Sequence, residues 1–173
     1  MQHGNGAATD ASRRGLLVDD HPMVRRGLVA ILKQLHRSIQ ILEAATVATA
    51  LGHLAAAQGM HLILYDWNLP QGGGMDGLRA LQRQAPRVPV LVMSGNDEQA
   101  YRIAAASVGA EFLAKSEEAE LVRQTLERLL AHPPAPGGQT GTAPAPRLTQ
   151  RQGEVLQLLA RGWPNKRIAR QLN

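Results

Sequence analysis

The chain has 173 residues, of which 44% are hydrophobic, and a formal net charge of +5. This length predicts one domain of about 100–150 residues with a short extension. The chain contains no cysteine, which excludes disulfide scaffolds, thiolate zinc sites and cysteine nucleophiles. No apolar run approaches the ~20 residues that cross a bilayer, and residues 1–14 lack a signal-peptide pattern, so we expect a cytoplasmic protein without a membrane partner.

The positive charge is confined to the C-terminal end of the chain. Residues 1–146 hold thirteen basic and thirteen acidic side chains, whereas residues 147–173 hold six basic side chains and one acidic side chain. This asymmetry indicates a polyanionic partner for the C-terminal end alone, with a solvated basic tail as the alternative.

The composition also divides the chain. Residues 1–13 show no periodicity and few large apolar side chains, which predicts disorder. Residues 132–147 are rich in Pro, Gly, Ala and Thr and are predicted to form a linker. Residues 14–131, between them, form the predicted first domain, and residues 148–173 follow the linker as a separate segment.

The first domain alternates between apolar runs and helical patterns. Short runs that are apolar on both faces predict buried parallel strands at 15–18, 39–42, 62–65, 88–93 and 111–114. One-sided apolar stripes predict helices between and after them, the first with Val24, Leu28, Ile31, Leu32 and Leu35, and the last with Val122, Leu126, Leu129 and Leu130. Five strand–helix repeats predict an α/β fold with a doubly wound five-stranded parallel sheet, whose ligands bind beyond the carboxyl ends of the strands.

Carboxylates follow two of these strands directly. Asp19 and Asp20 come after the first strand and Asp66 after the third, so the parallel sheet brings all three to one edge. Their convergence is electrostatically unfavourable unless a cation compensates, and Mg²⁺ is the hard divalent ion that carboxylate, carbonyl and water oxygens hold. The alternative is that these acids cap the helices that follow.

Two further polar residues lie at the same edge. Ser94 ends the fourth predicted strand and Lys115 ends the fifth. A hydroxyl and an ammonium beside a metal suit a phosphoryl group, whose oxygens they would bind. Since no histidine, serine–base pair or cysteine lies at these strand ends, a carboxylate is the natural nucleophile and would give an acyl phosphate.

The segments that carry these residues resemble the bacterial response regulators of the NarL/FixJ type, which join a receiver domain of flavodoxin-like fold to a LuxR-type helix-turn-helix. The matching segments are LLVDDHPMVRRGL (16–28), LILYDWNLP (62–70), MDGL (75–78), VLVMSG (90–95) and GAEFLAKS (109–116). They cover nearly the whole first domain. The joint spacing of Asp-Asp, Asp, Ser and Lys makes the resemblance specific.

The resemblance implies a role for each acidic residue of the cluster. Asp66 would accept a phosphoryl group from the phosphohistidine of a partner sensor histidine kinase. Asp20 would ligate Mg²⁺ directly, and Asp19 would act through water or as support. Asn68 would offer its backbone carbonyl to the same ion.

The resemblance also implies a conformational switch. Lys115 would contact the phosphoryl group, Ser94 would turn toward its oxygens, and Phe112, three residues before Lys115, would rotate inward with it. Phosphorylation would thereby promote a homodimer. Phe112 as a plain core residue is the alternative.

Two features near the cluster receive no chemical role. The loop NLPQGGGMDG after Asp66 is a few residues longer than the resemblance leads us to expect, and its glycines lack a phosphate-binding spacing. We therefore expect a flexible insertion. The histidines show no paired metal-ligand spacing, and His21 is expected at a helix start facing solvent.

Residues 148–173 return to a helical pattern. Thr149 and Gln152 form a capping box, and Gly162 followed by Pro164 marks the turn to a second helix. The segment resembles the opening of the LuxR-type DNA-binding domain, and the recognition helix of that family would follow it, so an incomplete helix-turn-helix is expected. Four of its basic side chains would contact DNA phosphates without specifying sequence: Arg161, Lys166, Arg167 and Arg170. Specific DNA binding would need a complete C-terminal domain.

The resemblance thus implies a response regulator that controls DNA binding and transcription after phosphotransfer to Asp66. One alternative is a receiver that acts only as a phosphate sink or interaction module without DNA binding. A second is an Mg²⁺-dependent phosphohydrolase. Such enzymes carry a second aspartate two residues after the nucleophile, where this chain has Asn68, so we expect no turnover catalysis.

Overall fold

The computed structural model describes residues 13–95 and 99–131. The predictions for the N-terminal segment, the linker and the helix-turn-helix, including the DNA-contacting Arg161, Lys166, Arg167 and Arg170, lie outside these residues. The domain boundaries inferred from composition therefore stay predictions.

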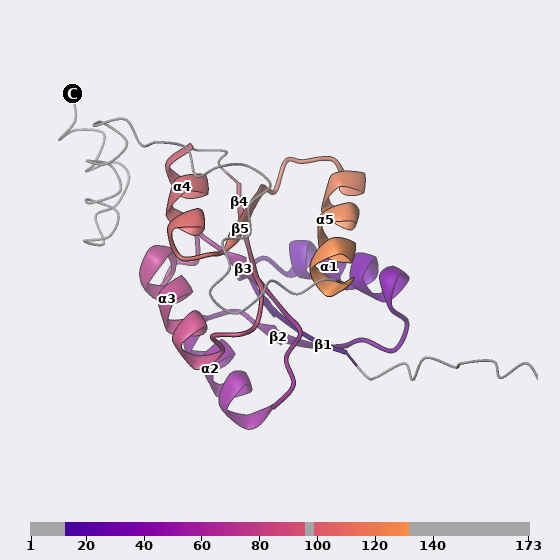
Figure 1. Cartoon of the computed structure of the whole chain (residues 1–173), viewed down its shortest axis with the longest axis horizontal. Coiled ribbons are helices and arrows are strands. Elements are labelled where there is room, and N and C mark those ends of the chain that lie inside the picture. Colours follow the sequence, from indigo (N-terminus) through magenta and orange to yellow (C-terminus); the bar gives the residue numbers. More distant parts are fainter. Residues whose placement is uncertain (1–12, 96–98, 132–173) are drawn as a thin grey trace, which may run out of the picture.

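The described chain alternates strictly between strands and helices (Figure 1). The strands are β1 (Arg14–Val18), β2 (Gln40–Ala44), β3 (Leu62–Asp66), β4 (Val90–Ser94) and β5 (Glu111–Ala114). The helices are α1 (Pro22–Leu35), α2 (Val47–Ala56), α3 (Gly74–Gln84), α4 (Gln99–Ser107) and α5 (Ala119–Ala131). All five predicted strands are present, with bounds that differ by up to two residues.

The strands form one parallel sheet in the order β2-β1-β3-β4-β5. The predicted doubly wound fold is therefore confirmed, and β1 and β3 are neighbours as that fold requires. β4 begins two residues later than its apolar run predicts. Pro89 lies in that run and has no N–H to donate to the sheet, and its carbonyl accepts from the N–H of Ile63 just before the strand begins.

Helices cover both faces of the sheet (Figure 1). Successive strand residues point to opposite faces, so Leu16 and Val18 pack with α2, α3 and α4, whereas Leu17 packs with α1 and α5. The strands β3 and β4 are buried along their whole length, which explains why their sequences show no alternation of polar and apolar residues. Among the described helices, none is both long enough and apolar enough to span a membrane.

Candidate functional site

Backbone hydrogen bonds continue the sheet one residue beyond the strands and fix the side chains at its carboxyl edge. The N–H of Asp19 donates to the carbonyl of Ala44 at 3.0 Å, and the N–H of Trp67 donates to that of Met93 at 2.8 Å. The N–H of Lys115 donates to the carbonyl of Ser94 at 2.7 Å. The residues that follow β1, β3 and β5 therefore start their loops from the same rim of the sheet.

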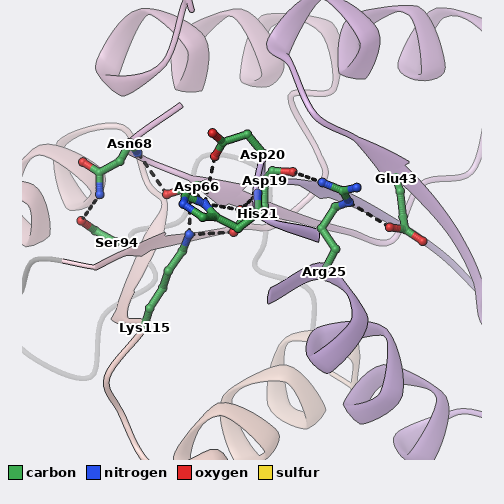
Figure 2. Close-up of polar contacts among 9 residues, drawn as sticks. All are labelled: Asp19, Asp20, His21, Arg25, Glu43, Asp66, Asn68, Ser94 and Lys115. Atoms are coloured by element: carbon green, nitrogen blue, oxygen red, sulfur yellow. Dashed lines mark hydrogen bonds and ion pairs between the residues drawn. The ribbon is translucent and has the colours of Figure 1, made fainter. Parts of the chain in front are cut away.

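The three predicted carboxylates meet at this rim together with one ammonium group (Figure 2). Nζ of Lys115 lies 2.7 Å from Oδ2 of Asp19 and 2.8 Å from Oδ2 of Asp66. Asp19 and Asp66 are buried, and Asp20 is partly exposed at the mouth of the pocket. One ammonium against three carboxylates leaves two negative charges, which is the charge that a divalent cation would neutralise.

Asp19 also has the capping role that the sequence left open as an alternative. Its Oδ1 accepts a hydrogen bond of 2.8 Å from the N–H of His21, the residue that precedes α1. Its other carboxylate oxygen faces Lys115. Asp19 therefore fixes the start of α1 and the position of the ammonium group at once.

The environment of Lys115 favours its charged form. Burial lowers the pKa of Lys115, but the carboxylates of Asp19 and Asp66 outweigh burial and hold that pKa above its ordinary value. The side chain therefore remains an ammonium throughout the neutral pH range, as the binding of phosphoryl oxygens requires.

Replacing Lys115 by Met should destabilise the protein in the absence of metal. The substitution leaves two buried carboxylates, Asp19 and Asp66, without their cation, and the Lys115 side chain is only 16% exposed. We expect the free energy of unfolding to fall by about 2 kcal/mol in EDTA, somewhat less than for a fully buried pair. Urea denaturation measures this loss. Lys33→Met on the exposed face of α1 is the matched control and should change stability little. If both substitutions lowered the free energy of unfolding equally, Lys115 would not be the cation that stabilises the buried carboxylates.

The fourth strand delivers Ser94 to the same pocket. Ser94 is fully buried, and its Oγ accepts a hydrogen bond of 2.9 Å from the side-chain amide of Asn68. The N–H of Asn68 donates to Oδ1 of Asp66 at 3.0 Å. The sequence predicted a role for the backbone carbonyl of Asn68 and missed that its side chain joins β3 to the serine of β4. No local pattern reveals a contact between residues so far apart in sequence.

Phe112 lies on β5 and is half-buried against the core. The guanidinium of Arg102 lies 5.0 Å from the centre of its ring, within the range of a cation–π contact. Arg102 also forms an ion pair with Glu117 at 3.5 Å, so it links α4 to the segment after β5. Phe112 is therefore neither plain core nor freely exposed.

Two residues that received no chemical role from the sequence also contact the site. Arg25 on α1 donates from Nη1 to the carbonyl of Asp19 at 2.7 Å and from Nε to Glu43 at 2.9 Å (Figure 2). It thereby joins β1, β2 and α1 behind the carboxylates. The imidazole of His21 is largely exposed, as expected, but its Nδ1 lies 3.0–3.8 Å from oxygens of all three aspartates. The expected position at the start of α1 and the exposure are therefore confirmed, and the contact of Nδ1 with the carboxylates is added by the structure.

The glycine-rich loop after Asp66 is held at its end by hydrogen bonds, and the flexibility expected of the rest of the insertion stays a prediction. The N–H of Gly74 donates to the carbonyl of Trp67 at 2.9 Å, and the hydroxyl of Tyr65 donates to the carbonyl of Gly74 at 2.9 Å. Gly72 and Gly74 have φ values of +68° and +64°, a conformation that favours glycine. These glycines therefore close the turn that leads from Asp66 into α3.

The donor set of the pocket fits a hard divalent cation. Oδ1 of Asp20 and Oδ2 of Asp66 are buried and accept no well-aligned hydrogen bond from the described residues; their near neighbours are His21 Nδ1 and Lys115 Nζ. Carboxylate oxygens are the ligands that Mg²⁺ prefers, and both of these oxygens keep lone pairs that an ion can use. The arrangement therefore offers oxygen ligands for an ion beside an ammonium group that can pair with an anion.

Comparisons with known proteins agree with this geometry. Residues 16–127 match the response regulator receiver domain, and residues 146–173 match the bacterial regulatory proteins of the luxR family. The chain is 33% identical over 172 residues to the transcriptional activator protein ExaE of Pseudomonas putida, and 28% identical over 173 residues to the nitrate/nitrite response regulator protein NarL of Escherichia coli. Each alignment covers 91% of this chain and 80% of the relative.

The fold comparison points the same way. The crystallised chemotaxis protein CheY4 of Vibrio cholerae superimposes with a TM-score of 0.61 at 25% identity, covering 69% of this chain and all of that protein. The receiver match alone spans more than half of the chain. The chain therefore belongs to the response regulators that join a receiver domain to a LuxR-type DNA-binding domain, regulatory proteins that control transcription in response to phosphorylation.

Proposed function

We propose that Asp66 is the phosphoacceptor of this response regulator and that a sensor histidine kinase is the donor. The observation that carries the proposal is the environment of its carboxylate. Oδ1 accepts a hydrogen bond from the N–H of Asn68, whereas Oδ2 is buried, accepts no well-aligned hydrogen bond from the described residues and faces Lys115 at 2.8 Å. The carboxylate can therefore attack phosphorus with one oxygen while the other oxygen stays available to an ion.

The transfer needs no other nucleophile. The Asp66 oxygen forms the new O–P bond while the N–P bond of the kinase phosphohistidine breaks, and the imidazole leaves with a proton. Lys115 lies where it can bind a phosphoryl oxygen. The Ser94 hydroxyl can donate to another once Asn68 and Ser94 move relative to the phosphorylated Asp66. The product is a mixed anhydride on Asp66.

Asp20 and Asp66, supported by Asp19 and the backbone carbonyl of Asn68, would hold Mg²⁺ in this pocket. When bound, the ion neutralises negative charge on the phosphoryl oxygens. Asn68 argues against turnover as a phosphohydrolase, because its amide cannot serve as the general acid and base that a second aspartate would supply.

Phosphorylation of the full chain by a small donor tests the proposal. Incubation with acetyl phosphate and Mg²⁺ should raise the intact mass by one phosphoryl group per chain, and EDTA should prevent the increase because the carboxylates then lack their counter-ion. No phosphate monoester should be turned over repeatedly. Multiple turnovers of p-nitrophenyl phosphate would favour the hydrolase, and labelling that is independent of divalent ions would contradict the metal assignment.

Phosphorylation should also change the association state of the protein. Binding of the phosphoryl group by Ser94 would break its bond to Asn68 and let Phe112 leave Arg102, which alters the surface formed by α4 and β5. We expect the monomer–dimer balance to shift toward the dimer, which would present two DNA-binding domains to a promoter. Sedimentation velocity with and without acetyl phosphate measures the shift. An unchanged balance would favour the alternative of a phosphate sink or interaction module.

A further inference from the structure

The imidazole of His21 lies at the mouth of the acidic pocket with one nitrogen directed at the carboxylates (Figure 2). Its Nδ1 forms a hydrogen bond of 3.1 Å with Oδ1 of Asp19, and it lies 3.0 Å from Oδ1 of Asp20 and 3.8 Å from Oδ2 of Asp66. Together these residues offer one nitrogen and three oxygens that all lie within 4.8 Å of one another. The site described above uses this nitrogen for no more than the hydrogen bond to Asp19. An ion that binds Nδ1 would take the place of its proton.

The backbone holds His21 in this position. Its N–H donates to Asp19 at 2.8 Å, and its carbonyl accepts from the N–H of Arg25 at 3.1 Å in the first turn of α1. Pro22 follows it at the first position of the helix, where its ring favours helical φ. The backbone of His21 is therefore fixed beside Asp19 and Asp20, which reduces the conformational entropy that the imidazole loses when it binds an ion.

The separations of these atoms are those of ligands around one small cation. Two ligands at right angles around an ion with bonds of about 2.1 Å lie about 3 Å apart. The distances from His21 Nδ1 to the oxygens of Asp19 and Asp20 match this spacing. The distance to Oδ2 of Asp66 is longer than that between ligands at right angles and shorter than that between opposite ligands. Oδ1 of Asp20 has no well-aligned hydrogen-bond donor among the described residues, so the 3.0 Å approach of the imidazole does not satisfy it.

The other described histidines are engaged elsewhere. His36 contacts Arg13, His61 accepts from the N–H of Arg14, and His53 contacts the carbonyl of Glu43. Among the described residues, only the group around Asp66 gathers three or more potential metal ligands. A nitrogen donor in such a group changes which ions it favours, because Mg²⁺ prefers oxygen whereas imidazole suits first-row transition metals.

We propose that His21 is an additional ligand of the ion in this pocket and makes the site selective for divalent transition-metal ions such as Mn²⁺ and Ni²⁺ over Mg²⁺. This inference rests on the metal site of the proposed function and extends it from three carboxylates to a mixed nitrogen and oxygen set. His21→Ala removes the nitrogen and leaves the carboxylates in place. The site would then discriminate less between Ni²⁺ and Mg²⁺.

Calorimetric titration of the full chain, free of any polyhistidine tag, tests the selectivity. We expect His21→Ala to weaken Ni²⁺ binding by at least about tenfold and Mg²⁺ binding by less than about threefold, since Mg²⁺ gains little from nitrogen. His61→Ala is the matched control, because it removes an imidazole bound to Arg14, away from the acidic group, and it should change neither affinity.

Pulsed electron paramagnetic resonance of bound Mn²⁺ tests ligation directly. A ligating imidazole gives ¹⁴N modulation of the electron spin echo, which a merely neighbouring residue does not. The modulation should be present in the wild type and in His61→Ala and absent from His21→Ala. Its persistence in His21→Ala would overturn the inference, as would equal losses of Ni²⁺ and Mg²⁺ affinity or a gain in Mg²⁺ affinity, which would show that the imidazole competes with the ion.

Asp20→Asn separates failure of this inference from failure of the metal site. If Asp20→Asn weakens both ions while His21→Ala changes neither, the acidic site stands and the role of His21 is wrong. If Asp20→Asn leaves both affinities unchanged, the ion does not bind at these carboxylates, and the metal requirement of the proposed function fails together with the role of His21.

Discussion

Asp66→Asn should abolish phosphoryl labelling of the protein. The amide oxygen of asparagine is a far weaker nucleophile than a carboxylate and cannot form a mixed anhydride with phosphate. The expected result is no mass increase after incubation with acetyl phosphate and Mg²⁺, against one phosphoryl group per chain for the wild type. Intact mass spectrometry, with acid-quenched samples, measures both.

Asp76→Asn provides the matched control for this experiment. Asp76 lies in the first turn of α3, is exposed and belongs to the same strand-to-helix connection as Asp66. It should be labelled like the wild type. Thermal melts test whether both variants are folded. Asp66→Asn removes one of three converging negative charges, so we expect it not to destabilise the metal-free protein. Undiminished labelling of a folded Asp66→Asn variant would contradict the assignment of the phosphoacceptor.

Gly77→Ala should destabilise the domain strongly because α3 approaches the loop after Asp66 too closely for a side chain. A Cβ at Gly77 would lie 2.4 Å from the carbonyl oxygen of Gly72, 2.4 Å from the hydroxyl of Tyr65 and 2.9 Å from a methyl of Val47. The carbonyl belongs to the backbone and cannot rotate away, and displacing Tyr65 would break its hydrogen bond to Gly74. We expect a loss of about 3 kcal/mol in the free energy of unfolding, measured by urea denaturation.

Gly52→Ala is the opposite case on a helix of the same domain. Gly52 lies in α2, is exposed, and a Cβ there would meet nothing within 4 Å. Alanine should therefore stabilise the protein by about 0.5–1 kcal/mol, because it lowers the conformational entropy of the unfolded chain. Losses of similar size in both variants would mean that the close approach at Gly77 does not exist in solution.

The buried oxygen of Tyr65 links this packing to the chemistry of the site. Burial, with the negative charges of Asp66 and Asp76, raises the pKa of Tyr65 well above its ordinary value. The hydroxyl therefore stays protonated at neutral pH and donates a hydrogen bond to the carbonyl of Gly74. Tyr65 immediately precedes Asp66, so the hydrogen bond that closes the glycine-rich turn also restrains the backbone of the proposed phosphoacceptor.

The amino-acid sequence determined most of the architecture by itself. The apolar runs marked five strands because strands covered on both faces must be apolar on both faces. The one-sided stripes marked α1 and α5 because each helix buries a single side. Once the sheet is parallel, residues that end or follow β1, β3, β4 and β5 must lie at one edge. The sequence alone therefore places Asp19, Asp66, Ser94 and Lys115 together.

Tertiary structure alone decided how the side chains at that edge pair. The amide of Asn68 bonds to Ser94 and the guanidinium of Arg102 lies on Phe112, and neither pair shows any periodicity because each joins different elements. The need for glycine at position 77 depends on how closely α3 packs against Gly72, Tyr65 and Val47. The direction of the His21 imidazole depends on how α1 begins, where one hydrogen bond to Asp19 turns an exposed side chain toward the carboxylates. Periodicity reports which face of an element is buried, whereas rotamers and contacts between elements are set by packing that the linear pattern does not encode.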